Sequence, residues 1–156
     1  MSSPNWWKTK LSASYGSAKI PDKVLEALSN VIVTATEGGC YTAEDYLGWK
    51  DYAHAENADR GFRAAVTVIP HQDAFADGKD PQKEIRVTPE WLHEQISKIV
   101  VADIDLMLSG QQQELGHRFG QAVRILSGDE DVAGEWDVVD AGAILQTAVY
   151  GKVVFG

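Results

Sequence analysis

A chain of 156 residues, 44% hydrophobic and 24% charged, is long enough to form one globular domain with a buried core, which excludes a disordered protein. No apolar run approaches the roughly 20 residues needed to cross a bilayer, so we expect no contact with a membrane. The formal net charge of −9 repels phosphate backbones, which argues against direct nucleic-acid binding and suits a basic partner surface.

The first 20 residues mix polar residues with a few aromatic ones and are predicted to form an irregular arm, partly packed against a single domain of residues 21–156. This segment lacks the apolar stretch and small-residue cleavage site of a secretory signal, so we expect a cytoplasmic protein. The chain has one cysteine, Cys40, which cannot form an internal disulfide and fits a reducing compartment.

The domain is predicted to begin with a helix over residues 21–36. Pro21 and Asp22 suit a first helical turn, and apolar residues recur at helical spacing up to two glycines, Gly38 and Gly39, which end the helix. The β-branched run at residues 31–34 favours a strand instead, but the apolar spacing is better explained by a helix.

Three strands are predicted to follow this helix. Between Tyr41 and His54 two sets of residues alternate, with Leu47, Trp49 and Ala53 in one set and Tyr46, Lys50 and Tyr52 in the other. Residues 42–45 also resemble a helical capping box, so a helix is the alternative there. The turn-rich segment 56–61 and the β-branched segment 62–69 complete a hairpin, and a third strand is expected near residues 84–87.

The second half of the chain is predicted to be helical. A helix begins at the capping residue Thr88 and ends at Gly110, and a second covers residues 112–126. A third covers residues 138–150, with Asp137 or Asp140 as its cap and Gly151 at its end. The predicted fold class is therefore α+β, in which a small antiparallel sheet of about three strands packs with about four helices.

No residues stand at the spacing of a catalytic set or a metal site. The histidines are isolated in the sequence and are expected to be solvated or at the edge of the core; they are His54, His71, His93 and His117. Asp103 and Asp105 lie two positions apart on a helix and cannot share an ion, and the acidic loop 127–134 lacks the ligand order of a calcium loop. We therefore predict no catalytic residue, no metal ion and no cofactor.

Two segments are candidate binding sites. The first places a carboxylate and two glycines at a helix end and aromatic residues after them, a combination that suits a planar ligand; its residues are Glu37, Gly38, Gly39, Tyr41, Tyr46 and Trp49. The alternative is a helix C-cap followed by strand residues that pack the core. The second segment is the acidic stretch 129–140, in which Trp136 would anchor a basic partner or, alternatively, lie at the edge of the core.

Residues 34–39, Thr-Ala-Thr-Glu-Gly-Gly, and the ending at 140–156, with Tyr150-Gly151 and Phe155-Gly156, resemble a family of uncharacterised small proteins from bacteriophages and prophages. In that family a helix leads into Thr-Ala-x-Glu-Gly-Gly and an aromatic strand. An aromatic pair that often follows the glycines is replaced here by Tyr41-Thr42, and Lys152 stands where the family has Glu in its tail. The resemblance brings no activity, but it implies a phage origin and a role in binding host proteins or defence signals.

The sequence thus leads to one main functional hypothesis and two alternatives. The main hypothesis is a phage-encoded accessory protein in the host cytoplasm that is not an enzyme and binds a host protein, plausibly to inhibit antiviral defence. The first alternative is a binder that sequesters a nucleotide-like signal around Glu37, Tyr41 and Trp49. The second is an enzyme that uses Glu37 with a histidine brought near by folding. A homodimer is compatible with the edges of a small sheet.

Overall fold

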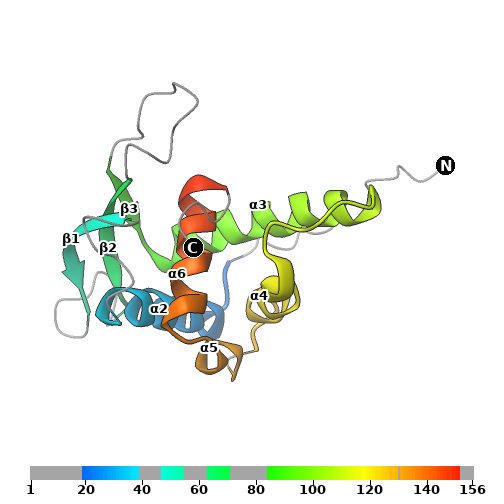
Figure 1. The fold of residues 1–156 in the computed structure, drawn as a ribbon. Helices are drawn as coiled ribbons and strands as arrows, with labels where there is room; N and C mark the ends of the chain where they lie inside the picture. Colours follow the sequence, from blue (N-terminus) through cyan, green and yellow to red (C-terminus); the bar gives the residue numbers. More distant parts are fainter. Residues whose placement is uncertain (1–18, 39–46, 55–62, 71–83, 130, 152–156) are drawn as a thin grey trace.

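The computed structural model describes residues 19–38, 47–54, 63–70, 84–129 and 131–151 (Figure 1). The predicted arm therefore lies almost wholly outside the described residues, as do Cys40 and the turn at 56–61. The predicted α+β class is confirmed, since a three-stranded antiparallel sheet packs beside a group of helices. Described elements run along the chain as α2 (Asp22–Glu37), β1 (Leu47–Ala53), β2 (Ala65–Pro70), β3 (Ile85–Val87), α3 (Pro89–Leu108), the 3-10 turn η3 (Gly116–Arg118), α4 (Phe119–Leu126), α5 (Asp131–Glu135) and α6 (Val138–Tyr150).

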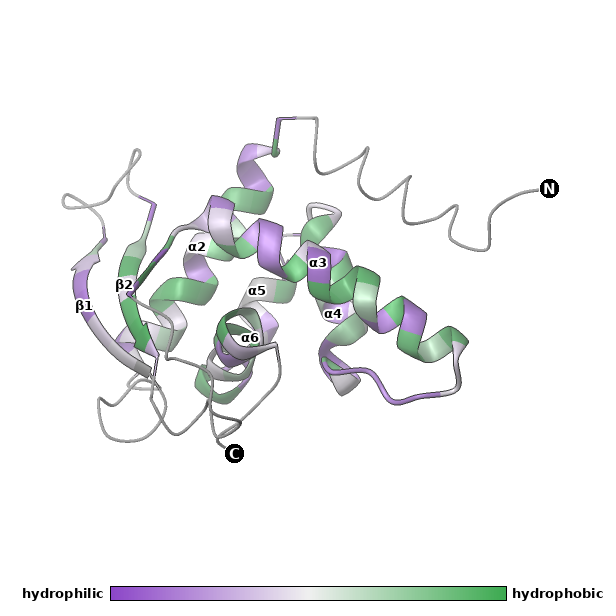
Figure 2. Ribbon diagram, turned by 90° about the horizontal axis from the view of Figure 1, so that it is seen from above, coloured by the Kyte–Doolittle hydropathy of each residue, from purple (hydrophilic) through white to green (hydrophobic). Residues whose placement is uncertain are grey.

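The sheet has the strand order β1-β2-β3, and its middle strand shows the clearest two-faced pattern. Val66 and Val68 of β2 are completely buried, whereas Thr67 between them is partly exposed and Ile69 after them is 40% exposed. This alternation follows from the two-residue period of a strand and gives the sheet an inner face, covered by helices, and an outer face. Figure 2 shows the sheet at one side of the helices, with apolar residues along β2.

The core fills the space between the inner face of the sheet and helices α2, α3 and α6. Its fully buried side chains come from all of these elements and include Leu28, Ile32, Val66, Val68, Leu92, Ile96, Ile144 and Leu145. One buried polar bond ties the layers together, because the backbone N–H of Ala64 donates to Oγ of Ser29 on α2 at 2.8 Å. A buried N–H with an acceptor avoids the cost of an unsatisfied donor.

Two helices begin where their capping residues predict. The Thr88 side chain accepts a hydrogen bond from the Trp91 N–H at 3.1 Å, and Pro89 occupies the first turn of α3. Both candidate caps of α6 act together in a capping box, in which Asp137 and Asp140 each accept the other's backbone N–H. Helix α2 covers residues 22–37 and thus settles the choice between helix and strand at residues 31–34.

Two predictions in the second half of the chain are wrong. The helix expected over 112–126 begins only at Phe119, after the short 3-10 turn, because both carboxylate oxygens of buried Asp103 hold the backbone N–H groups of Glu114 and Leu115 at 2.7 and 2.9 Å. The acidic loop expected at 127–134 contains the short helix α5, before which Asp129 accepts a hydrogen bond from the Asp131 N–H at 3.1 Å. In both places a carboxylate outside the apolar pattern sets the local structure.

Candidate functional site

Four side chains meet at one place, one from the end of α2 and three from β1 and the residue that follows it. The Tyr52 hydroxyl donates to Oε2 of Glu37 at 2.6 Å, and Nδ1 of His54 lies 3.1 Å from the same oxygen. The Trp49 ring stands nearly perpendicular to the Tyr52 ring, at 79° with 6.1 Å between centroids, and the His54 ring is also 6.1 Å from Tyr52. We call Glu37, Trp49, Tyr52 and His54 the aromatic–carboxylate cluster.

A β-bulge in β1 brings these side chains together. Lys50 pairs with Thr67 and Ala53 pairs with Ala65, so Asp51 and Tyr52 together lie opposite Val66 alone. Asp51 adopts a φ of 52°, in the left-handed region typical of the first residue of one bulge type. Because the bulge uses one extra residue, Tyr52 points to the inner face on which Trp49 also lies, opposite Val68.

The alternation expected for this strand is therefore wrong after Lys50. A regular strand would place Trp49 and Tyr52 on opposite faces, whereas the bulge places them in ring contact. Arg86 on β3 supports the bulge from the outer face, since its Nη1 donates to the carbonyl oxygen of Asp51 at 2.6 Å and to Oγ1 of Thr67 at 3.2 Å. No sequence signal marks this bulge, because an aspartate stands where glycine is usual.

Glu37 lies at the negative end of a helix. Its carboxylate belongs to the last residue of α2, where the helix dipole places about half a negative charge, and the last turn of α2 contains no basic residue. The Glu37 side chain is 53% exposed, and burial and the hydrogen bond to Glu37 raise the pKa of Tyr52 above its ordinary value. Tyr52 therefore stays a neutral donor to Glu37 throughout the physiological range.

The predicted candidates of the first segment are only partly described. Glu37 and Trp49 are brought together as the aromatic and carboxylate parts of one site, whereas Gly39, Tyr41 and Tyr46 lie outside the described residues. Gly38 has a structural reason that needs no ligand: a Cβ there would overlap the Val138 side chain and the Thr34 carbonyl oxygen. The glycine thus allows the end of α2 to approach the start of α6 closely.

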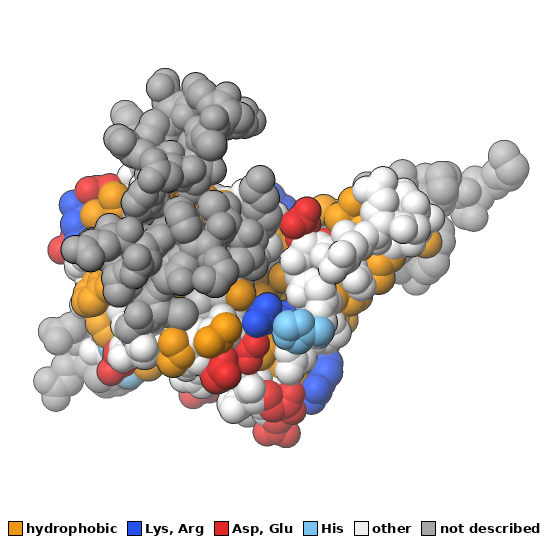
Figure 3. All heavy atoms as spheres, viewed as in Figure 1, with side chains coloured by type: hydrophobic (Ala, Val, Ile, Leu, Met, Phe, Trp, Pro, Cys, Tyr) orange, Lys and Arg blue, Asp and Glu red, His pale blue; other side chains and the backbone are white. Residues whose placement is uncertain are grey.

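Trp136, the candidate anchor of the acidic stretch, lies in the core and not on the surface. The alternative interpretation places it at the edge of the core. Its side chain is only 4% exposed, and its indole N–H donates to Oε1 of Gln121 at 2.6 Å. Arg124 binds Asp129 at 2.8 Å and Arg118 binds Asp140 at 2.9 Å, so basic residues of the preceding segment compensate part of the acidic stretch. Figure 3 shows basic and acidic side chains next to one another over this part of the surface.

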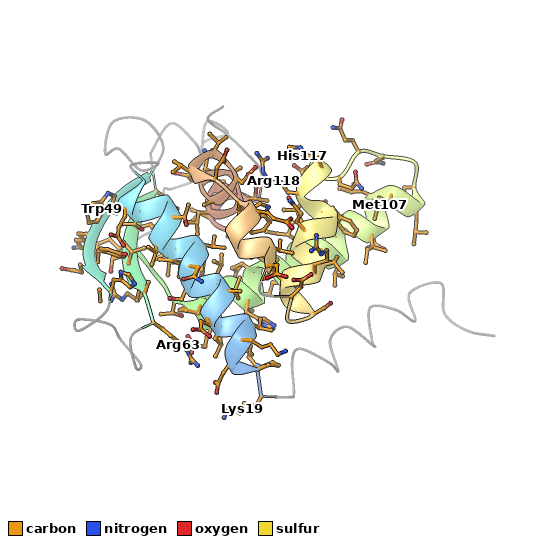
Figure 4. All side chains as sticks on the ribbon, turned by 90° about the horizontal axis from the view of Figure 1, so that it is seen from below. Lys19, Trp49, Arg63, Met107, His117 and Arg118 are labelled. Atoms are coloured by element: carbon orange, nitrogen blue, oxygen red, sulfur yellow. The ribbon has the colours of Figure 1, made fainter. Side chains whose placement is uncertain are left out.

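Two members of the cluster were missed or undervalued by sequence reasoning. His54 was expected to be isolated, yet it lies beside Glu37; this is the arrangement that the enzyme alternative required. Tyr52 is one of the aromatic residues that follow the glycines of the first candidate segment, but the sequence does not single it out as a binding residue. The remaining histidine of interest, His93, is 3% exposed and belongs inside the protein rather than at the edge of the core. Figure 4 shows Trp49 at the sheet end of the molecule, away from Met107 near the end of α3.

Comparisons with protein-family models, with curated proteins and with solved structures found no match to this chain. Within the described ranges, no helix is long and apolar enough to cross a membrane. The same residues contain no group of three or more His, Cys, Asp or Glu side chains that could hold a metal ion. The aromatic–carboxylate cluster is therefore the feature of the described residues from which a function can be inferred.

Proposed function

We propose that this chain is a binding protein that recognises its partner through the aromatic–carboxylate cluster. The observation that supports the proposal is the state of Trp49, which is 42% exposed and yet held at a fixed angle by Tyr52, itself anchored on Glu37. An exposed tryptophan with a fixed orientation offers a large contact area at little cost in side-chain entropy. Tryptophan is enriched among the residues that dominate binding interfaces.

The partner class that we propose is a protein of the bacterial host, bound by a phage-encoded accessory protein. The resemblance of residues 34–39 and 140–156 to small phage proteins supports the origin, and the net charge of −9 supports a partner with a basic surface. Inhibition of host defence is the role that such binding would serve.

A second candidate function is acid–base catalysis, which the contact between His54 and Glu37 favours. A carboxylate on Nδ1 orients an imidazole and leaves Nε2 to take or give a proton. The cluster supplies no hydroxyl or thiol nucleophile beside this nitrogen, because its one hydroxyl, on Tyr52, donates to Glu37. Binding explains more of the geometry, since catalysis gives no role to the exposed ring of Trp49.

Affinity capture with matched variants tests the proposal. Tagged full-length chain, Trp49→Ala and Leu108→Ala are each incubated with lysates of several bacterial hosts, and bound proteins are compared by mass spectrometry. Leu108 is the control, because it is 69% exposed at the end of α3 and lies outside the cluster. We expect a captured protein that is lost with Trp49→Ala and retained with Leu108→Ala. Capture that is unchanged in Trp49→Ala, or no specific capture from any lysate, contradicts the proposal.

A separate measurement distinguishes binding from catalysis. If His54 and Glu37 form a catalytic pair, His54→Gln abolishes turnover of a substrate while ligand binding remains. If the cluster only binds, His54→Gln and the wild-type chain leave candidate ligands chemically unchanged, as followed by mass spectrometry of the ligand. A ligand converted by the wild-type chain but not by His54→Gln would establish the second candidate.

A further inference from the structure

We infer that the group bound at the aromatic–carboxylate cluster is a planar cation, a guanidinium, and this inference rests on the proposed binding function. Three features of the cluster point to positive charge: an exposed carboxylate at the negative end of a helix, two aromatic rings at a right angle, and basic side chains of the sheet that lie on the other face. Each feature is independent of the others, and together they specify both the charge and the shape of the ligand.

The carboxylate supplies the charge. Glu37 ends α2 at the negative pole of the helix dipole, and no basic residue in the last turn offsets it. Tyr52 and His54 both contact Oε2. Within the described residues, the other oxygen, Oε1, accepts no hydrogen bond. A cation that approaches Oε1 gains a charge-assisted hydrogen bond and offsets the helix dipole at the same point.

The rings supply the shape. Trp49 and Tyr52 meet at 79° and form two walls of a corner beside the carboxylate. The negative faces of aromatic rings attract cations, most strongly for tryptophan, and a flat guanidinium can also stack on such a face while its N–H groups reach an oxygen. A compact ammonium group lacks this stacking and hydrogen-bonds less directionally, so the corner favours guanidinium over ammonium.

The same features argue against a nucleotide, the ligand class of the first alternative. A phosphate next to Glu37 and the C-terminus of α2 would be repelled. The basic side chains of the sheet lie on its outer face, where Lys50 binds Glu84 at 2.7 Å and Arg86 binds the carbonyl oxygen of Asp51. Trp49 and Tyr52 lie on the inner face, and the one basic group in the cluster is the imidazole of His54.

A guanidinium could come from an arginine side chain of a partner protein or from a small molecule such as agmatine. The test uses four probes with the full-length chain: an acetylated and amidated Gly-Arg-Gly peptide, the same peptide with citrulline, the same peptide with lysine, and agmatine. Citrulline has nearly the shape of arginine but no charge, so it isolates the contribution of the cation. Guanosine monophosphate serves as the competing ligand class.

Binding is followed through the indole ¹H–¹⁵N signal of Trp49, which is identified by its loss in Trp49→Phe. We expect the arginine peptide to shift this signal saturably, with an affinity on the order of millimolar for so small a probe. The citrulline peptide should bind roughly tenfold more weakly or not at all, because the cation–π and charge-assisted contacts are lost. The lysine peptide should lie between the two. Tighter binding of the peptide than of agmatine would assign the guanidinium to a protein partner, and the reverse to a small molecule.

Two variants check that the signal reports the cluster. Glu37→Gln keeps the shape of the side chain and an acceptor for Tyr52 but removes the charge, and we expect it to weaken the arginine peptide roughly tenfold. Leu108→Ala should bind as the wild type does, and unchanged amide signals in the core show that each variant is folded.

Equal binding of citrulline and arginine peptides, or tighter binding of guanosine monophosphate, would overturn the inference. In either case a Trp49-dependent ligand would remain, so the proposed binding function would stand. If none of these probes shifts the Trp49 signal, the inference is wrong, and lysate capture that is equally independent of Trp49 would then reject the binding function as well.

Discussion

Single buried polar side chains hold backbone segments in place through hydrogen bonds to their N–H groups. Asp103 is the clearest case, because it is completely buried and accepts two backbone N–H groups, from Glu114 and Leu115. A buried donor that loses its acceptor costs more free energy than the net gain from an ordinary hydrogen bond. This carboxylate therefore fixes how the chain turns back after α3.

We expect Asp103→Ala to lower the free energy of unfolding by about 2–4 kcal/mol, because it leaves two N–H groups without an acceptor. Glu94→Ala on the same helix is the control: Glu94 pairs with Lys98 on an exposed surface, and its loss should cost less than about 0.5 kcal/mol. Urea denaturation measures both. Equal midpoints for the two variants would show that Asp103 is not the anchor of this segment.

At position 38 there is room for the hydrogen atom of glycine but not for a methyl group. Since a Cβ at this position would overlap the Val138 side chain and the Thr34 carbonyl oxygen, we expect Gly38→Ala to destabilise the protein by about 1–3 kcal/mol. Gly120→Ala is the matched control, because a Cβ at Gly120 meets nothing within 4 Å and alanine is the better helix former. Its melting temperature should stay the same or rise, while that of Gly38→Ala falls; a tolerated Gly38→Ala would contradict the close approach of α2 and α6.

At the scale of elements, the bulge in β1 determines whether the aromatic–carboxylate cluster forms. Two residues of β1, Asp51 and Tyr52, lie opposite Val66, and this single extra residue changes the face to which Tyr52 points. Asp51 at a φ of 52° is tolerated because aspartate visits the left-handed region more readily than most residues. Glycine has no steric penalty there, whereas a β-branched residue has a large one.

We therefore expect Asp51→Gly to retain or slightly raise stability and Asp51→Val to lower it by about 1–2 kcal/mol. Asp51→Val should also shift the Trp49 indole signal, because a strand without the bulge would separate Trp49 from Tyr52. Lys50→Val controls for the change in side-chain type at a neighbouring outward position and should leave the signal in place. An unaltered Trp49 signal in Asp51→Val would show that the bulge does not form the cluster.

The elements that could be predicted from the sequence are those whose signals are local. Helices α3 and α6 begin directly after the residues that cap them, Thr88 and Asp137, and α2 carries its apolar stripe within its own length. The start of α4 could not be predicted, because it depends on Asp103, which lies 11 positions before the N–H that it binds. The spacing of apolar residues within a segment gives no information about a contact with so distant a residue.

The candidate site divides in the same way. Glu37 and Trp49 could be proposed from the composition of one segment, a carboxylate at a helix end followed by aromatic residues. Tyr52 and His54 could not be placed beside them, since the expected alternation of a regular strand puts Tyr52 on the opposite face from Trp49. In the acidic stretch, the sequence overstates the local negative charge. The acidic residues are adjacent in sequence, but Arg118, 22 positions before Asp140, compensates part of their charge in space.

At the scale of the whole molecule, the acidic side chains of the described residues are unevenly compensated. Around α5 and the start of α6, Arg118 and Arg124 pair with acidic residues, whereas the cluster at the sheet end leaves Glu37 with histidine and tyrosine contacts. The net charge of the chain would attract a basic molecule. At the sheet end such a molecule would meet Oε1 of Glu37, which within the described residues accepts no hydrogen bond, beside two aromatic rings. Such attraction raises the rate of encounter more than the final affinity and weakens with salt.

The same charges and buried groups set the pH range in which the molecule is stable. Burial lowers the pKa of His93 below its ordinary 6.5, so the unfolded chain binds this proton more readily and stability falls as the pH decreases below about 6.5. Burial and Glu37 raise the pKa of Tyr52 above its ordinary 10.0, so stability falls as the pH increases beyond about 10. We expect a plateau in the free energy of unfolding between about pH 7 and 10, measured by urea denaturation across the range.

Two variants test these assignments. His93→Gln should flatten the decline in the free energy of unfolding between pH 7 and 5, and Tyr52→Phe the decline above pH 10, even if each variant lowers the plateau itself. If either variant keeps the wild-type dependence of unfolding free energy on pH in its range, the replaced side chain does not cause the decline there. By linkage, this dependence follows the difference in bound protons between the folded and unfolded states.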